Sequence, residues 1–369
     1  MDTGIGRSAE ITADTPARNS FNQSSDNYHG SNPGNNSGNN SGNNSGINSG
    51  INSGSNSGNN LEVHMEQIDG LIGLNDIIFQ IEQEIRIREA APVITEADID
   101  RLRDFDYLRT QFFVSDRNTR LLPQDIDVDA FLRKDFTINT SGMTGARSSG
   151  AEQNSGAGPR VLIFHTHSTE MFADSDPANP MDGVLGLGAA LADILEREYG
   201  IETIHDTRRY DIVDGRSQIM GAYERMEPYV RQILRENPTI EVVIDLHRDG
   251  LPEGAPPLIS YINGQRAARI MFVNGLSRRY NSSGVLEEVP WLPNPHLREN
   301  LAFSFQLQLA ANRLYPGFAR RVYLKAFRYS LHLMPRTILL EVGAQNNTME
   351  EAHNALPHVA TILADVILP

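Results

Sequence analysis

The chain carries the sequence VLIFHTHSTE at residues 161–170, in which an apolar run is followed directly by two histidines and a carboxylate. A short apolar run after a Gly- and Ser-rich stretch predicts a buried β-strand. His167 and Glu170 are spaced H-x-x-E in the turn after this strand, and we expect both to reach one divalent metal ion. His165 competes with His167 for the ligand role. We prefer His167, with His165 pointing into the domain or holding a ligand in place.

Two further predicted strands lead to residues of the same kind. The run at 241–246 precedes His247, and the run at 337–340 precedes Glu341. In an open α/β sheet, ligands bind outside the carboxyl ends of the strands, so these side chains are expected to meet at one edge. The ligand set His167, Glu170 and His247 with an open position is typical of a catalytic zinc site, and Glu341 can serve as the base.

The two glutamates also have structural interpretations. Glu170 could cap the segment that follows it. An ionised carboxylate at Glu341, which ends an apolar run, must pair with something, and an arginine such as Arg328 or Arg336 is the alternative to a catalytic role.

Other charged residues surround His247 in the sequence. We expect the side chain of Asp245 to point opposite to that of His247, which favours a structural or supporting role over metal binding. Arg248 and Asp249 follow His247. An ion pair between them at the pocket rim is the preferred interpretation, and binding of a substrate carboxylate by Arg248 is the alternative.

From residue 160 onward, predicted strands and helices alternate. Strands are predicted at 160–164, 203–205, 240–246, 269–273, 322–324 and 337–341, and helices at 185–199, 216–236, 301–314 and 349–366. The segment 301–314 begins with strict apolar alternation, which is typical of a strand, but its unbroken length favours a helix. This alternation predicts an α/β fold with a mostly parallel sheet and helices on both faces.

The rest of the chain divides by composition. Residues 1–60 are poor in apolar side chains and contain an N-x-S-G repeat, which predicts a disordered tether. Residues 61–140 are predicted to hold a helix at 61–88 and a small lead-in module, and residues 141–158 a second Gly/Ser linker. Residues 159–369, about 210 in number, are enough for one α/β domain.

The composition excludes several classes of protein. The net charge is −15 and no basic cluster is present, so nucleic acid is not an expected partner. The chain has no cysteine, which excludes a disulfide framework and Cys-ligated zinc. No apolar stretch approaches the ~20 residues of a membrane span, and residues 1–19 lack the apolar core of a secretory signal. From the residues alone, we expect a soluble chain that starts in the cytosol.

Several stretches of the sequence resemble the catalytic domain of the stage II sporulation protein P family. They are VLIFHTHSTEMF at 161–172, YGIETIHD at 199–206, VVIDLHRDG at 242–250, NLAFSFQLQL at 300–309, YPGF at 315–318 and LLEVGAQNNTMEEAHNAL at 339–356. The resemblance implies a zinc-dependent (Zn²⁺) peptidoglycan hydrolase with a fold similar to that of N-acetylmuramoyl-L-alanine amidases. It further implies cleavage of the amide between muramic acid and the stem peptide, with cleavage of peptide cross-links left open.

The resemblance also carries expectations about partners and location. The family acts in engulfment with stage II sporulation proteins D and M, and it usually begins with a membrane anchor. It therefore implies an extracytoplasmic, membrane-associated protein at the engulfing septum, although this chain shows an Asn/Ser/Gly repeat where the anchor is expected. Two alternatives to the amidase are a catalytically silent wall-binding or scaffolding module and a zinc carboxypeptidase that acts on free peptides.

Overall fold

The computed structural model describes residues 96–126, 128 and 158–368. These residues belong to one compact unit, His64–Pro369, and the other unit, Met1–Val63, lies outside them. The predicted tether, the predicted helix at 61–88 and nearly all of the predicted linker also lie outside the described residues. Within the described ranges, the structure contains no helix that is both long and apolar enough to cross a membrane.

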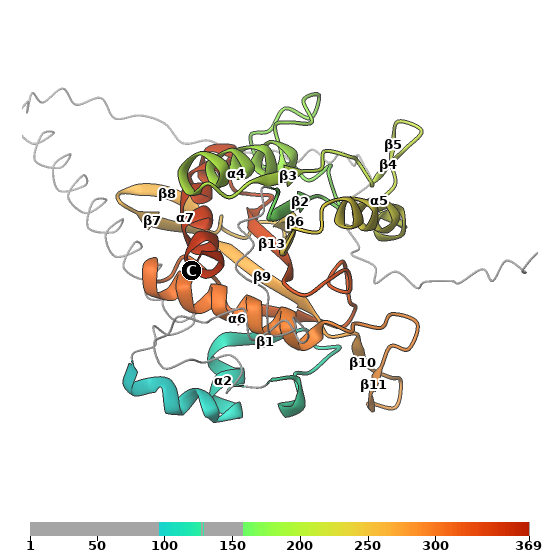
Figure 1. The fold of residues 1–369 in the computed structure, drawn as a ribbon, viewed down its shortest axis with the longest axis vertical. Helices are drawn as coiled ribbons and strands as arrows, with labels where there is room; N and C mark the ends of the chain where they lie inside the picture. The colour runs from blue at the N-terminus through green and yellow to red at the C-terminus, as the bar shows by residue number, and fades with distance from the viewer. Residues whose placement is uncertain (1–95, 127, 129–157, 369) are drawn as a thin grey trace, which may run out of the picture. The chain divides into compact units, whose positions relative to one another are not determined.

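A seven-stranded sheet forms the centre of the fold (Figure 1). Its strands, in spatial order, are β1 (Phe113–Ser115), β12 (Val322–Lys325), β9 (Ile270–Gly275), β13 (Thr337–Ala344), β6 (Val242–Asp249), β2 (Val161–Phe164) and β3 (Thr203–His205). Neighbouring strands are parallel except for the antiparallel pair β13 and β9. The prediction of a mostly parallel α/β sheet is therefore confirmed.

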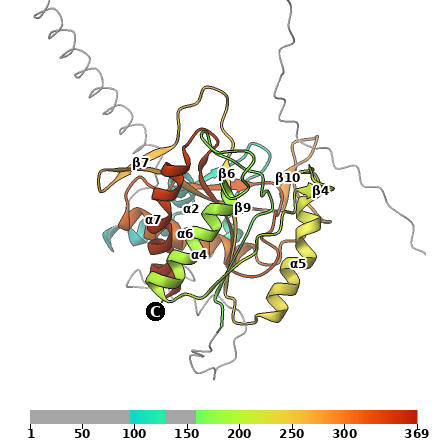
Figure 2. The same cartoon turned by 90° about the horizontal axis from the view of Figure 1, so that it is seen from above.

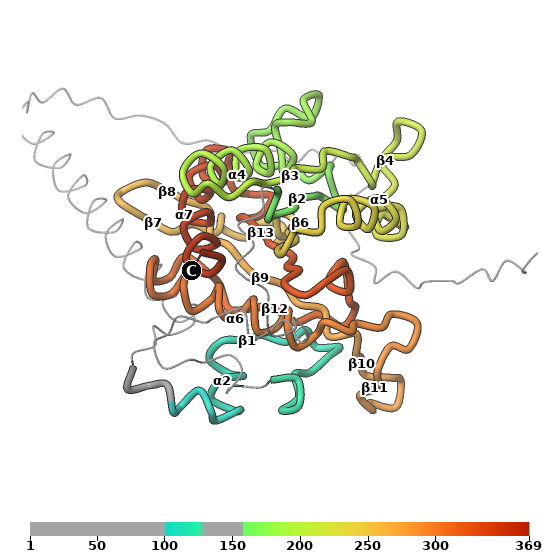
Figure 3. The backbone as a smooth tube through the Cα atoms, viewed as in Figure 1, coloured from blue at the N-terminus to red at the C-terminus, as the bar shows by residue number. Residues whose placement is uncertain are grey.

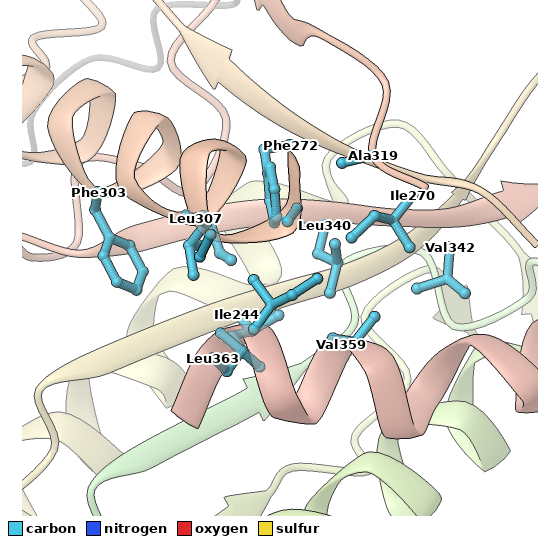
Figure 4. Packing of buried hydrophobic residues seen from close by; sticks show 14 of the residues in the cluster. Ile244, Ile270, Phe272, Phe303, Leu307, Ala319, Leu340, Val342, Val359 and Leu363 are labelled. Atoms are coloured by element: carbon cyan, nitrogen blue, oxygen red, sulfur yellow. The ribbon is translucent and has the colours of Figure 1, made fainter. Parts of the chain in front are cut away.

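Helices cover both faces of this sheet, as Figure 2 shows from above. The long helices are α4 (Val184–Tyr199), α5 (Ala222–Glu236), α6 (Leu297–Leu314) and α7 (Met349–Ile367). Helices α4, α6 and α7 share the larger apolar core with one face, while α5 packs on residues such as Leu162 and Val243 of the opposite face. The two faces separate because successive side chains of a strand point to opposite sides. Figure 4 shows strand residues, including Ile244 and Leu340, packed between α6 and α7.

The segment before residue 159 contributes to the same fold. It forms a 3₁₀-helix (Glu96–Arg103), α2 (Phe105–Phe112), the edge strand β1 and a second 3₁₀-helix (Pro123–Asp125). Phe112 and Phe113 pack on Phe305 of α6, with ring centroids 5.1 Å and 6.1 Å apart. The sheet thus includes a strand from the predicted lead-in region, before the expected start of the domain at residue 159.

This packing explains the ambiguous pattern at 301–314. The segment is helical, and every residue from 300 to 312 is buried. A helix that is enclosed on all sides needs no polar stripe, so its apolar residues follow no single period. The last helix, α7, begins at Met349 and is capped by Thr348, whose side chain accepts from the N–H of Glu351 in a capping box.

Three hairpins were not expected from the sequence. They are β4 (Ile212–Val213) with β5 (Arg216–Ser217), β7 (Ile259–Ile262) with β8 (Gln265–Ala268), and β10 (Arg278–Tyr280) with β11 (Leu286–Glu288). The first of them replaces the start of the helix predicted at 216–236, so α5 begins at Ala222. The backbone trace in Figure 3 shows the β10–β11 hairpin projecting from the body of the fold.

Candidate metal centre

His247 and Glu341 lie within strands, where the sequence predicted the first just beyond a strand and the second at a strand's end. Strand β6 continues to Asp249 and β13 to Ala344. The two residues are register partners on adjacent parallel strands, so their side chains emerge on the same face of the sheet. The strands are longer than expected because they keep their pairing past these polar residues.

Three side chains form a compact cluster. His167, Glu170 and His247 each offer one potential ligand atom, and these atoms all lie within 4.8 Å of one another. Nδ1 of His247 lies 3.2 Å from Oε2 of Glu170, and Nδ1 of His167 lies 3.6 Å from Oε1 of the same carboxylate. Two imidazoles and a carboxylate at such separations fit the donor set of a tetrahedral zinc site with an open position.

The cluster is open on one side. The side chain of His247 is 4% exposed, whereas that of His167 is 24% exposed. The His167 and His247 rings lie 5.1 Å apart at nearly a right angle. A substrate can therefore approach from the side of His167, while His247 forms the floor.

The turn that carries His167 and Glu170 is held by several hydrogen bonds. The carboxylate of Asp211 accepts from the hydroxyl of Ser168 (2.5 Å) and from the N–H (2.9 Å) and hydroxyl (2.6 Å) of Thr169. Farther along, the N–H of Val184 donates to the carbonyl of Glu170, and a Cβ at Gly183 would lie only 2.6 Å from that oxygen. These contacts fix the loop between β2 and α4 at the cluster.

Glu170 does not cap a helix, so that alternative interpretation is wrong. Helix α4 begins at Val184, and its N-cap residue, Gly183, has no side chain that could cap it. The carboxylate of Glu170 instead accepts the backbone N–H of Arg248 at 3.0 Å. This bond joins the turn after β2 to β6 and aims the carboxylate at His247.

Asp245 points to the same side as His247, and the prediction of opposite directions is wrong. Residues two apart in a strand share a face. Oδ1 of Asp245 accepts from Nε2 of His247 (2.7 Å) and from the N–H of Thr166 (2.9 Å), while Oδ2 accepts from the Thr166 hydroxyl (2.7 Å). A carboxylate that holds one ring nitrogen of a histidine leaves the other free to bind a metal ion. The supporting role expected for Asp245 is consistent with this geometry.

His165 lies apart from the cluster, beneath α4. It is fully buried, with Nδ1 2.8 Å from the carbonyl of Leu246 and Nε2 2.8 Å from Nε2 of His205. A Cβ at Gly188 of α4 would come within 2.5 Å of both imidazoles, so the helix approaches closely only because this residue is glycine. Burial, and next His205, lower the pKa of His165 to about 3, and the ring stays neutral.

Arg248 forms no ion pair with Asp249, contrary to the preferred prediction. Its Nε donates to the carbonyl of Met171 (3.0 Å) and its Nη1 to the carbonyl of Asp249 (3.3 Å). The carboxylate of Asp249 pairs with Arg320 at 2.5 Å. The guanidinium of Arg248 therefore binds backbone carbonyls and supports the loop after Glu170.

Within the part of the chain that the structure describes, Glu341 forms no ion pair with an arginine. Arg336 pairs with Glu241 at 3.2 Å, and Arg328 lies 3.6 Å from Glu227. Oε2 of Glu341 is buried and has no hydrogen-bond partner among the described residues. The salt-bridge alternative is wrong, and the carboxylate stands beside the cluster with one oxygen unsatisfied.

The pKa values of Glu341 and Glu170 are shifted in opposite directions. Burial raises the pKa of Glu341 to about 8, and the neighbouring Glu170 adds to the rise. Burial alone would raise the pKa of Glu170 as well, but the imidazole of His247 and then that of His167 hold it below its usual range. The carboxylates of Asp245 and Glu170 raise the pKa of His247 well above its usual value, against the effect of burial. Both carboxylates therefore favour the protonated form of His247.

Two aromatic residues at the cluster were missed by the sequence analysis. The ring of Tyr223, in the first turn of α5, lies 5.7 Å from that of His167. Tyr329 lies 5.6 Å from Tyr223. Neither belongs to a motif, and α5 is far from His167 in the sequence, so only the fold reveals the contact.

Comparison with known proteins places most of the chain in one family. The profile of stage II sporulation protein P matches residues 116–367. Stage II sporulation protein P of Bacillus subtilis (strain 168) is 24% identical over 229 residues, which cover 58% of this chain and 53% of that protein. The chain therefore spans about half the length of that relative.

Solved structures of amidases also match, at low scores. The N-acetylmuramoyl-L-alanine amidase AmiC2 of Nostoc punctiforme is 14% identical, with a TM-score of 0.33 over 57% of this chain and 95% of its own. The CwlD amidase from Clostridioides difficile, in complex with the GerS lipoprotein, is 10% identical with a TM-score of 0.33 over 56% of this chain and 96% of its own. The catalytic domain of CwlV from Bacillus (Paenibacillus) polymyxa var. colistinus is 15% identical, with a TM-score of 0.31 and the same coverage.

Proposed function

The chain belongs to the stage II sporulation protein P family, and from this premise we propose that it is a zinc-dependent peptidoglycan hydrolase. The proposed reaction is hydrolysis of the amide between N-acetylmuramic acid and the L-alanine of the stem peptide. The observation that carries the proposal is the cluster of His167, Glu170 and His247 with the unpaired carboxylate of Glu341 beside it.

The three residues of the cluster would hold the zinc ion. When bound, zinc lowers the pKa of water toward ~7 and polarises a carbonyl group. His247 would bind through Nδ1, because its Nε2 is hydrogen-bonded to Asp245. Glu170 is positioned by the N–H of Arg248, and His167 forms the exposed side of the site.

Glu341 is the proposed base. It accepts a proton from the water that attacks the carbonyl carbon and returns that proton to the amide nitrogen as the C–N bond breaks. Its pKa of about 8 lies near neutral pH, where a general base is most effective, and a cation in the site would favour the ionised form. No donor among the described residues hydrogen-bonds to Oε2, which is left to accept a proton.

Product analysis tests the proposal. The full-length chain, loaded with zinc, should release intact stem peptides with a free L-alanine amino group from purified cell-wall sacculi, and a chelator should stop the release. Mass spectrometry distinguishes the alternatives: single terminal amino acids indicate a carboxypeptidase, and fragments cut within cross-links indicate an endopeptidase. Binding to sacculi without any release indicates a silent wall-binding module.

The family resemblance extends the proposal to setting and partners. We propose that the chain acts on the extracytoplasmic side of the engulfing septum, in association with the membrane and with stage II sporulation proteins D and M. Co-purification of these proteins with the tagged chain from sporulating cells tests this part. Absence of both from material that retains hydrolase activity contradicts it.

A further inference from the structure

An aromatic pair forms one wall of the candidate metal centre. Tyr223 stands nearly perpendicular to His167, at an interplanar angle of 76°, and Tyr329 packs on Tyr223 at 68°. Tyr223 comes from the start of α5, and Tyr329 comes from the loop between β12 and β13. Two segments that are far apart in the sequence therefore converge on one side of His167.

The loop that carries Tyr329 is fastened to α5 one turn beyond Tyr223. Glu227 follows Tyr223 by four residues, which places both side chains on the same face of the helix. Its carboxylate lies 3.1 Å from Nε2 of His332 and 3.6 Å from the guanidinium of Arg328. Glu227 and the ring contact thus hold the loop against α5 at two successive points.

The backbone of Tyr329 is strained in this arrangement. Its φ is 52°, in the left-handed region that residues other than glycine rarely adopt. Such a conformation persists where surrounding contacts impose it, and it is frequent at functional sites. The contacts with Tyr223 and the Glu227 clamp, defined as Glu227 with Arg328 and His332, supply that constraint here.

The hydroxyl of Tyr223 has no hydrogen-bond partner among the described residues, although it lies close to the charges of the site. The carboxylates of Asp245, Glu170 and Glu341 lie close enough to act on this hydroxyl electrostatically. A phenol, whose ordinary pKa is about 10, carries its proton at neutral pH and can donate a hydrogen bond. The Tyr223 side chain is half-buried, so its hydroxyl remains accessible to a ligand, which can supply the acceptor for its proton.

We propose that Tyr223 donates a hydrogen bond to the carbonyl oxygen of the amide that is cut, and that Tyr329 and the Glu227 clamp hold the ring in place for this contact. The inference rests on the proposed function. Negative charge develops on the carbonyl oxygen as water adds to the carbon, and a fixed donor at that position stabilises the transition state more than the substrate. Tyr223 is thus a catalytic residue, and Tyr329 is a positioning residue.

Removal of the hydroxyl alone tests the catalytic role. Tyr223→Phe keeps the ring on His167, so zinc affinity and KM should remain within about 3-fold of the parent, while kcat falls ~100-fold or more, as for other single donors of this kind. Tyr229→Phe is the matched control, since Tyr229 lies on the same helix with a side chain that is largely exposed. It should leave kcat unchanged. A Tyr223→Phe enzyme with a kcat within about 3-fold of the parent would overturn the proposal.

The positioning role has its own test. Tyr329→Ala removes the ring contact with Tyr223 and should lower kcat with little change in KM. Tyr329→Phe restores the ring and should restore kcat. If the phenylalanine variant is as slow as the alanine variant, the ring contact is not what matters, and the role assigned to Tyr329 is wrong.

A binding measurement tests Tyr223 independently of the natural substrate. Acetohydroxamate chelates zinc through its carbonyl oxygen and its N–O oxygen, and the carbonyl oxygen stands in for the oxygen of the amide. Titration calorimetry on the zinc-loaded full-length chain should show that Tyr223→Phe binds this probe at least ~10-fold more weakly than the parent does. Equal affinity would overturn the proposal. A parent that binds the probe in a Tyr223-dependent manner but releases no stem peptides would contradict the proposed substrate and leave the donor role supported.

Discussion

Nε2 of His247 lies 2.7 Å from Oδ1 of Asp245, two residues earlier on the same strand. This bond fixes the ring so that Nδ1 faces Glu170 at 3.2 Å. The hydroxyl and N–H of Thr166 hold the carboxylate in turn. The orientation of His247, the most buried of the three candidate ligands, is therefore set by a network of hydrogen bonds and not by the backbone alone.

Asp245→Asn should weaken zinc binding by ~10–100-fold, the usual effect of losing a partner that orients a ligand. The amide preserves the shape but removes the charge that holds the histidine. Competition with a chromophoric chelator measures the change. Thr166→Val is the control: it removes one bond to Asp245 and leaves the N–H bond, so its effect should be smaller. An unchanged affinity in Asp245→Asn contradicts the role assigned to Asp245.

Alanine substitution should separate the two neighbouring histidines. His167→Ala removes a partly exposed ligand, so the variant should lose zinc while its metal-free form unfolds near the parent's temperature. His165→Ala removes a buried ring and leaves His205 and the Leu246 carbonyl without partners, which should cost about 1–3 kcal/mol of stability. The zinc affinity of this variant should change by less than ~10-fold, which is smaller than the loss expected when a residue that orients a metal ligand is removed. The reverse pattern, measured by metal analysis and thermal unfolding, would reverse the ligand assignment.

Zinc binding should release protons and should strengthen as pH rises. Burial lowers the pKa of His247, but Asp245 and Glu170 raise it well above the usual value, so the imidazole is protonated in the metal-free protein at neutral pH. A metal ion needs the neutral ring, and the proton must leave. Calorimetry at pH 7 in buffers of different ionisation enthalpy should show release of at least one proton per zinc. If the heat of zinc binding is identical in all buffers, no proton is released, and this would contradict the ion pairs of His247 with Asp245 and Glu170.

Glu341→Gln should stabilise the metal-free protein increasingly at higher pH. The folded-state pKa of Glu341 is raised to about 8 from 4.5, so the contribution of this group to stability is fully present below pH 4.5 and is lost as pH rises through 8. The loss amounts to at most ~1.4 kcal/mol per pH unit across that window. Urea unfolding of both proteins between pH 5 and 8.5 measures the difference. A difference that does not grow with pH contradicts the burial of an ionisable carboxyl group at this position.

The alternation of strands and helices could be predicted from the sequence, and so could the proximity of His167, Glu170 and His247. Long apolar runs specify buried strands, and parallel strands carry their ends to one edge. Two of the three hairpins were missed although their turns had a signal. Asp214-Gly215 and Asn263-Gly264 have positive φ at both residues, as two-residue hairpin turns require.

Other features could not be read from local pattern. The direction of the Asp245 side chain was predicted wrongly, because side chains two residues apart in a strand, such as those of Asp245 and His247, point to the same face. The bond from Arg248 to the carbonyl of Met171 depends on a loop from a distant part of the chain, and the lack of a partner for Oε2 of Glu341 among the described residues is likewise a result of tertiary packing. The contact of Tyr223 with His167 arises only when α5 packs on the sheet. Tertiary contacts of this kind produce no periodic pattern in the sequence from which they could be predicted.

The most direct test of the central claim compares the parent with Glu341→Gln on purified sacculi, with bound zinc quantified in the same samples. Both proteins should carry one equivalent of zinc, the parent should release intact stem peptides, and the variant should release them at least ~100-fold more slowly. A parent that holds a full equivalent of zinc and releases no stem peptides, or a variant as fast as the parent, would contradict the account.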